Sequence, residues 1–147
     1  MKKFAPVLLM ALLPLSVLAQ TDDADWKQQP SSQEKYKLYL NAKTYQREGD
    51  VVNVTMRYVF AEPQVFPFLN IKYNRMERSF AFQCKEHKSV ALDNNYYMGD
   101  KKVHSINPVG GNPFQSKEQA LIPQKVAPST HEDEALTQSC SYMVDKK

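Results

Sequence analysis

The stretch VVNVTMRYVF at residues 51–60 decides the fold of this chain. Bulky apolar side chains occupy every second position, and mostly polar side chains stand between them. This period of two is typical of a β-strand that is buried on one face only. The apolar face carries Val52, Val54, Met56, Tyr58 and Phe60, whereas Asn53, Thr55 and Arg57 lie on the other face. We therefore expect a sheet with one covered face at the centre of the chain.

Further strands are expected on both sides of this stretch. Glu48-Gly49-Asp50 is a turn signal, so residues 43–47 and 51–60 are predicted to pair as a hairpin. Gly99-Asp100 is a second tight connection. Because Arg78 interrupts an apolar strand face, a strand end or bulge is expected near it. The other candidate strands are residues 36–40, 72–85, 87–92, 96–98 and 101–107, with a turn at residues 93–95.

The segment AEPQVFPFLN at residues 61–70 is predicted to be a loop, because Pro63 and Pro67 are excluded from a central strand. Its apolar content is unusual for a loop. Val65, Phe66 and Phe68 either cover an edge of the core or form an exposed contact patch, and the sequence leaves both readings open.

A helix is predicted at the C-terminal end of the chain. Residues 108–128 are a proline-rich loop with a short helical turn expected at residues 116–121. Ser129 and Glu132 then fit a capping box, in which each side chain meets the backbone N–H of the other. Leu136, Cys140 and Val144 recur four residues apart, which places Cys140 on the buried face of the helix.

The two cysteines, Cys84 and Cys140, are predicted to form a disulfide bond. The alternatives are a redox pair, which usually has the spacing Cys-x-x-Cys, and a metal site. Cys84 lies on the apolar face of its candidate strand, as Cys140 does on its helix. The predicted fold is therefore an α+β domain: an antiparallel sheet of five to six strands with a C-terminal helix packed on it, stapled by one disulfide.

The chain begins with a stretch that has the composition of a secretory signal peptide. Lys2 and Lys3 precede an apolar segment at residues 4–18, and Val17-Leu18-Ala19 is a cleavage site before Gln20. The apolar segment is too short to span a bilayer. We expect residues 1–19 to be removed, residues 20–35 to be a flexible N-terminal segment, and residues 36–147 to form the domain. Because no cysteine follows the cleavage site, we expect a soluble exported protein without a lipid anchor, in the periplasm or at the cell surface.

Composition and motifs argue against several functions. Removal of the signal lowers the formal net charge from +3 to +1, which is not typical of a nucleic-acid-binding domain. His87, His104 and His131 are scattered and form no metal motif. The chain also lacks a nucleophile elbow and a phosphate-binding glycine loop. We therefore expect no catalytic residues, no metal and no cofactor.

A binding surface is the remaining possibility for the middle of the chain. If neighbouring strands bring its basic residues together, they form a surface for anionic envelope polymers or acidic protein segments. The alternative is a solvated sheet face with interspersed acids. Tyr97, Lys101 and Lys102 are the candidate binding patch, since only one residue of the pair Tyr96-Tyr97 can face it. The basic residues concerned are Lys72, Arg75, Arg78, Lys85, Lys88, Lys101 and Lys102.

Several segments together resemble the bacterial surface-adhesin protein E family over residues 36–147. They are the hairpin and aromatic-ended strand at residues 45–60, MERSFAFQC at residues 76–84, YYMG at residues 96–99, and a proline-rich loop leading to a helix that ends in Cys140. The closing VDKK is similar to the tail of the founding member. The resemblance implies a six-stranded antiparallel sheet with a packed helix, one disulfide and homodimers.

The resemblance also implies binding of the host-matrix proteins vitronectin, laminin and plasminogen, with haem binding also attributed to the family. Its founding member is a lipoprotein, whereas Gln20 stands where the lipid-carrying cysteine would be. The primary hypothesis is an exported, non-enzymatic binding protein that contacts host matrix or envelope macromolecules. The alternatives are a periplasmic protein of unknown role and an envelope inhibitor, for example of lysozyme.

Overall fold

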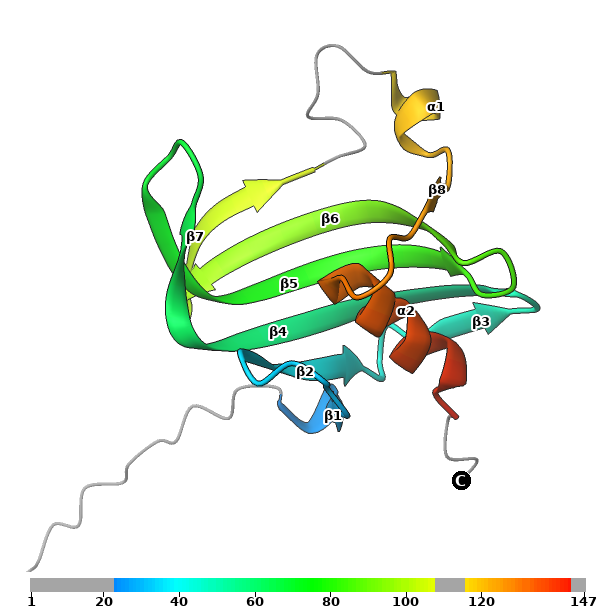
Figure 1. Ribbon diagram of the computed structural model, residues 1–147, viewed down its shortest axis with the longest axis horizontal. Helices are drawn as coiled ribbons and strands as arrows, with labels where there is room; N and C mark the ends of the chain where they lie inside the picture. Colours follow the sequence, from blue (N-terminus) through cyan, green and yellow to red (C-terminus); the bar gives the residue numbers. More distant parts are fainter. Residues whose placement is uncertain (1–22, 108–115, 144–147) are drawn as a thin grey trace, which may run out of the picture.

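A computed structural model describes residues 23–107 and 116–143 of the chain (Figure 1). Its main feature is an eight-stranded sheet in the order β1-β2-β4-β5-β6-β7, with β3 paired to β4 and β8 paired to β6. All pairings are antiparallel. The strands are β1 (Trp26–Gln29), β2 (Tyr36–Asn41), β3 (Gln46–Glu48), β4 (Val51–Phe66), β5 (Ile71–Gln83), β6 (Lys88–Met98), β7 (Lys101–Ile106) and β8 (Gln124–Lys125), and the helices are η1 (Asp23–Asp25), α1 (Lys117–Ala120) and α2 (His131–Ser141).

Helix α2 covers one face of the sheet and lies across β4 and β5 (Figure 1). Ala135, Leu136 and Ser139 are its buried residues, and they meet the apolar face that the sequence predicts for residues 51–60. Burial of these side chains away from water is the main favourable contribution to folding. The core of the sheet consists of Tyr36, Leu38, Leu40, Val52, Val54, Met56, Tyr58, Phe60, Met76, Phe80, Phe82 and Tyr96.

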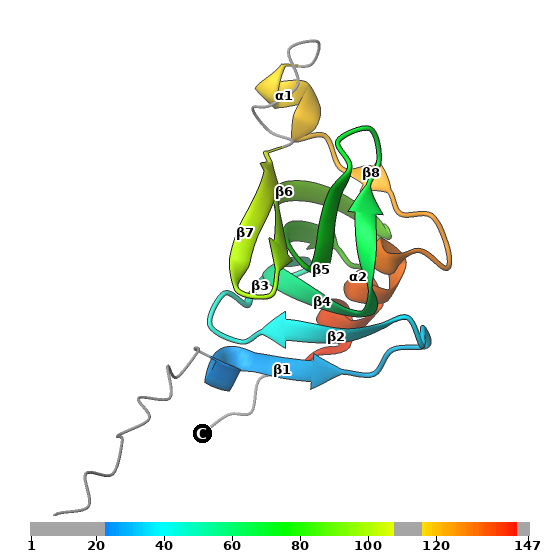
Figure 2. The ribbon, with the colours of Figure 1, turned by 90° about the vertical axis from the view of Figure 1, so that its left-hand side faces the viewer.

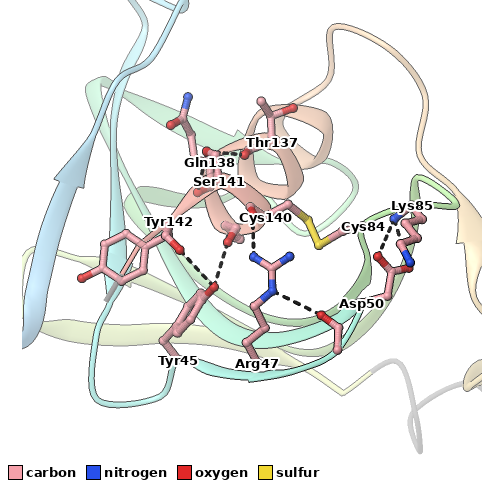
Figure 3. The surroundings of a disulfide bond; sticks show 12 residues. Tyr45, Arg47, Asp50, Cys84, Lys85, Thr137, Gln138, Cys140, Ser141 and Tyr142 are labelled. Carbon is pink, nitrogen blue, oxygen red and sulfur yellow. Dashed lines mark hydrogen bonds between the residues drawn. A yellow bond between two sulfur atoms is a disulfide. The ribbon is translucent and has the colours of Figure 1, made fainter. Parts of the chain in front are cut away.

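The disulfide between Cys84 and Cys140 joins the end of β5 to the end of α2, with 5.8 Å between the two Cα atoms (Figure 3). The predicted staple is therefore present. The helix end is also held from β3 and the turn before it. Tyr45 donates its hydroxyl hydrogen bond to the carbonyl oxygens of Ser139, at 3.2 Å, and Tyr142, at 3.4 Å, and Arg47 donates to that of Cys140 at 2.8 Å. The carbonyls of Ser139 and Cys140 belong to the last turn of α2, where carbonyls lack partners within the helix, so Tyr45 and Arg47 cap the C-terminus of α2.

The predicted N-terminal cap of α2 was wrong by one residue. Thr130, not Ser129, is the N-cap, and its hydroxyl accepts a hydrogen bond from the Asp133 backbone N–H at 3.1 Å. In return, the Asp133 carboxylate accepts from the Ser129 N–H at 2.8 Å. Ser129 has a φ of 60° and so cannot adopt the extended conformation of an N-cap. Glu132 instead accepts a hydrogen bond from Ser89.

The number of strands was underestimated, because five to six were predicted and the sheet has eight. One of the additional strands, β1, lies within residues 20–35, which were expected to be flexible. Trp26 pairs with Asn41 and Gln29 with Leu38 along the outer edge of β2. Backbone hydrogen bonds to an available strand edge do not need an apolar sequence pattern, so a polar segment can add to the sheet.

Two predicted interruptions are wholly or largely strand in the structure. The predicted loop at residues 61–70 is largely strand, because β4 runs to Phe66 and β5 begins at Ile71. These ends form an arm whose pairing shifts in register between Val59 and Gln64, which accommodates Pro63. The predicted turn at residues 93–95 also lies inside β6. A register shift between Ser79 and Phe80 occurs beside it, next to the bulge expected near Arg78.

Other local predictions are confirmed. The hairpin of β3 with β4 turns at Gly49, and that of β6 with β7 turns at Gly99, both with a positive φ that favours glycine. The short helix α1 begins after the N-cap Ser116, where a helical turn was expected. Val144, predicted on the helix face, lies outside the described residues, as do residues 1–22.

Candidate binding face

The face of the sheet opposite α2 is not covered by another element of the described chain. Strand alternation turns toward it the residues that lie between the core positions. In β4 these include Arg57, which pairs with Glu77 of β5, and in β5 they include Arg75, which pairs with Tyr97 of β6. Figure 2 shows β1 and β2 at one end of the sheet and β7 at the other. We call this surface the open face.

Aromatic rings and charged groups alternate across the open face. We call the following six residues the open-face row: Trp26 of β1, Arg57 of β4, Glu77 and Arg75 of β5, Tyr97 of β6 and Lys102 of β7. The Arg57 guanidinium carbon lies 3.9 Å from the centre of the Trp26 ring. The Arg75 guanidinium carbon lies 4.3 Å from the centre of the Tyr97 ring, and Lys102 Nζ lies 5.8 Å from the same centre. These are cation–π distances.

The two arginines of the row are held differently. Arg57 makes close ion pairs with Asp23 at 3.0 Å and with Glu77 at 2.9 Å. Arg75 lies 3.6 Å from both Glu77 and Asp100, which is too far for a hydrogen bond. Its Nε atom is buried and has no hydrogen-bond partner in the described part of the chain. Arg75 therefore has donor capacity that the protein itself does not use.

A shallow depression of about 550 Å³ lies beside the row. It extends from η1 and β1 to the turn between β6 and β7, so it joins segments far apart in the sequence. Its lining combines aromatic, cationic, acidic and amide groups: Asp23, Trp26, Tyr39, Arg57, Val59, Asn74, Arg75, Gly99 and Asp100. Burial raises the pKa of the neighbouring Tyr97 hydroxyl, and the negative charge of Glu77 raises it further. The Tyr97 hydroxyl therefore stays protonated at neutral pH.

The candidate patch predicted from sequence is only partly assembled. Tyr97 and Lys102 are paired residues of β6 and β7 and lie on the open face. Tyr96 is buried in the core, so one tyrosine of the pair faces outward, as the alternation predicts. Lys101 pairs with Met98, one residue along from Tyr97, and the alternation of the strand turns it to the other face.

The larger basic cluster does not form. Arg78 lies on the face that α2 covers, where it donates to Asn94 at 2.8 Å and stacks on Phe80. Lys88 pairs with Glu86 at one end of β6, and Lys72 lies on the arm of β4 and β5. These residues are close in the chain, which is why the sequence predicts one cluster, but the strands carry them to different parts of the surface. Trp26, Arg57 and Tyr39 were missed as site residues, and the lone tryptophan in a polar segment was the one signal for them.

The histidines lie apart in the structure. His87 forms an ion pair with Asp133 at 2.8 Å, His104 packs on Phe66, and His131 packs on Tyr36. Burial and the positive charge of Arg78 lower the pKa of His131. Within residues 23–107 and 116–143, no group of three or more His, Cys, Asp or Glu side chains is placed to hold a metal ion.

The exposed tip of the β4–β5 arm resolves the two readings of residues 65–68. Phe66 is half-buried, with its ring centre 5.2 Å from that of Tyr96 and 5.0 Å from that of His104. Val65 is 51% exposed and Phe68 fully exposed. One residue of the three therefore covers the core edge and the other two form an exposed apolar tip.

Fold and surface together define a small disulfide-stapled α+β domain with one covered and one open sheet face. The sequence profile of the surface-adhesin protein E family matches residues 26–141, which is well over half of the chain. The chain therefore belongs to the surface-adhesin protein E family. The match begins at Trp26, so the family domain includes β1, ahead of the boundary expected at residue 36.

Comparison with solved structures gives protein E of Haemophilus influenzae. Its crystal form II is similar with a TM-score of 0.45 and 12% sequence identity, over 75% of this chain and 90% of that one. Protein E from non-typeable Haemophilus influenzae is similar with a TM-score of 0.40 and 11% identity, over 74% of this chain and 77% of that one. No match to this sequence was found among curated proteins. Among the described residues, no helix is long and apolar enough to cross a membrane.

Proposed function

We propose that this protein is an exported, non-enzymatic binding protein of the cell envelope, and that its open face contacts a macromolecule of the host matrix or of the envelope. The open-face row is the observation that carries the proposal. Tryptophan, tyrosine and arginine are the residues most enriched where protein interfaces gain their binding energy. Here they lie side by side on the sheet face that α2 leaves uncovered.

Membership of the surface-adhesin protein E family supports a binding role rather than a catalytic one. The disulfide between Cys84 and Cys140 supports export, because such bonds persist in oxidising compartments. A signal peptide at residues 1–19, the absence of a lipid anchor and a homodimeric state remain predictions. Sedimentation of the purified protein tests the last of these.

Binding to immobilised vitronectin, laminin and lipopolysaccharide tests the proposal. The double variant Tyr97→Ala, Lys102→Gln removes one end of the open-face row. Lys85→Gln is the control, since Lys85 is also an exposed lysine and lies beside the disulfide, away from the open-face row. We expect binding of the wild type to at least one of these surfaces, a loss of about tenfold or more in the double variant, and no change in the control.

Two outcomes would contradict this proposal: no binding to any of the three surfaces, or equal binding by the double variant and the wild type. A lysozyme-inhibition assay with the same proteins tests the inhibitor alternative. Protease treatment of intact cells and of spheroplasts tests location. Cleavage on intact cells places the protein at the surface, whereas cleavage in spheroplasts alone places it in the periplasm.

A further inference from the structure

We infer that the depression beside the open-face row binds one acidic sugar residue, of the hexuronic or sialic acid class, with its carboxylate on Arg75. The inference rests on the proposed function, because it names a ligand class for the same face. It adds a defined contact: a carboxylate that makes two hydrogen bonds to the one guanidinium of the row that is not already paired closely.

The surroundings of Arg75 suit the binding of a carboxylate. Its nearest acidic oxygens, on Glu77 and Asp100, are both 3.6 Å away, and its side chain is 21% exposed. Because the Nε atom is buried, a ligand carboxylate has to bind the terminal nitrogens of the guanidinium. The planar guanidinium matches a carboxylate through two parallel N–H···O bonds. The Tyr97 ring, 4.3 Å from the guanidinium carbon, supports its flat side. By contrast, Arg57 is already paired with Asp23 and Glu77, so it belongs to the lining of the depression but has no free position for a ligand carboxylate.

The remaining lining favours a sugar over an acidic peptide or a polyanion. Asp23 is an acidic residue of the lining, so it repels a second negative charge on the ligand and can accept hydrogen bonds from sugar hydroxyls. The Asn74 side-chain oxygen accepts from the Gly99 N–H at 2.9 Å, which leaves its NH₂ group as a donor. Trp26 and Tyr39 add flat apolar surfaces for the C–H face of a ring. A ligand with one carboxylate and several hydroxyls fits this combination.

Asp100 occupies the position that the ligand carboxylate takes. It stands on the tight turn after Gly99, with its side chain 89% exposed, and it approaches Arg75 without reaching hydrogen-bond distance. An arriving carboxylate displaces it at little cost, since an exposed ion pair contributes little to stability. Removal of the Asp100 charge should therefore strengthen ligand binding, which is the opposite of what loss of a structural contact would do.

The single tryptophan of the chain provides the readout, because Trp26 lines the depression. We would titrate the mature protein with glucuronic acid, with sialyllactose, and with lactose as the uncharged match, and record tryptophan fluorescence. The inference predicts a saturable change with at least one acidic sugar and a response to lactose about tenfold weaker or less. The two acidic probes distinguish the hexuronic from the sialic acid class.

Variants assign the effect to Arg75. Arg75→Gln should weaken binding about tenfold or more, and Arg75→Lys should recover part of it, because lysine keeps the charge but not the fork. Asp100→Asn should tighten binding about threefold. Lys37→Gln, an exposed lysine of β2 outside the lining, should change nothing. Tighter binding by the Asp100→Asn variant cannot result from misfolding, since a damaged protein does not gain affinity.

The inference is overturned if neither acidic sugar changes the fluorescence, if lactose binds equally well, or if a pentaglutamate peptide binds more tightly than both acidic sugars. These failures are separate from those of the proposed function. Retained binding to a matrix protein without sugar binding would reject the sugar and keep the open face. Sugar binding without any macromolecular binding would keep the sugar site and reject the proposed binding of a host or envelope macromolecule.

Discussion

The Arg57 guanidinium carbon lies 3.9 Å from the centre of the Trp26 ring, so a side chain of β4 contacts the N-terminal strand β1 across the intervening strand β2. The same arginine pairs with Asp23 of η1 and with Glu77 of β5. One side chain of the central strand thus connects the segment at the start of the described chain to the middle of the open face.

Loss of the Trp26 ring should release β1. In Trp26→Ser, we expect faster amide exchange at residues 27–29 and faster proteolysis within residues 23–35. The free energy of unfolding should fall by about 1 kcal/mol, which is the scale of a half-exposed cation–π contact. Lys27→Ser on the same strand is the control, because Lys27 is exposed. Unchanged exchange at residues 27–29 in the tryptophan variant would show that backbone pairing alone holds β1.

Removal of the disulfide should destabilise the whole domain. Cys84 and Cys140 are 56 residues apart, and closing a loop of this length contributes about 4 kcal/mol in the chain-entropy account. The double variant Cys84→Ser, Cys140→Ser should therefore melt at a lower temperature and be cleaved faster by protease. The comparison is made without reductant, and reduced wild type should behave like the variant. Equal melting temperatures for the variant and the oxidised wild type would refute the staple.

The two phenylalanines of the β4–β5 arm should differ in their effect on stability. Phe66 packs on Tyr96 and His104, so Phe66→Ala should cost about 2 kcal/mol, below the range for a fully buried ring. Phe68 is fully exposed, so Phe68→Ala should change the free energy of unfolding by no more than about 0.5 kcal/mol. Urea denaturation measures both. Equal costs would mean that the arm tip is packed in solution.

Stability should fall in acid because of Glu134. Burial of its carboxyl group opposes ionisation, but hydrogen bonds from Tyr36, Ser32 and Ser31 outweigh that effect and lower its pKa. A pKa lower in the folded state means stability that is present above the ordinary value of 4.5 and lost as the pH falls below it. Thermal melts of Glu134→Gln should show a lower melting temperature at neutral pH and a weaker dependence below that value. A parallel pH profile for variant and wild type would assign the acid sensitivity to other groups.

The sequence was sufficient where a local pattern and a tertiary contact agree. The alternation at residues 51–60 predicts the covered face of β4, and the spacing of Leu136 and Cys140 predicts the face of α2 that meets it. Cys84 and Cys140 then follow as partners, because both fall on those faces. The turns at Gly49 and Gly99 could likewise be predicted, since each needs a positive φ.

The rest depends on contacts that no local pattern carries. Residues 26–29 are polar, and they become a strand because the edge of β2 is available to them. The arm of β4 and β5 passes Pro63 through a register shift, which a rule against proline in strands does not anticipate. The binding face was predicted from nearby charges, but register decides which of them meet. The register of β5 with β6 places Arg75 beside Tyr97 on the open face, whereas Arg78 lies beside Phe80 on the opposite face.

Hydroxyl-radical footprinting of the protein, alone and bound to the macromolecule that it captures, tests whether the open face is the binding surface. Trp26 and Tyr97 lie on the open face, whereas Met143, at 85% exposed, and Phe68 lie at the helix end and the arm tip. All four are reactive side chains, so each reports on its own surface. If the open face is the binding surface, Trp26 and Tyr97 should be oxidised more slowly in the complex, whereas the oxidation of Met143 and Phe68 should be unchanged. Protection of Met143 or Phe68 with Trp26 and Tyr97 unchanged would contradict this proposal.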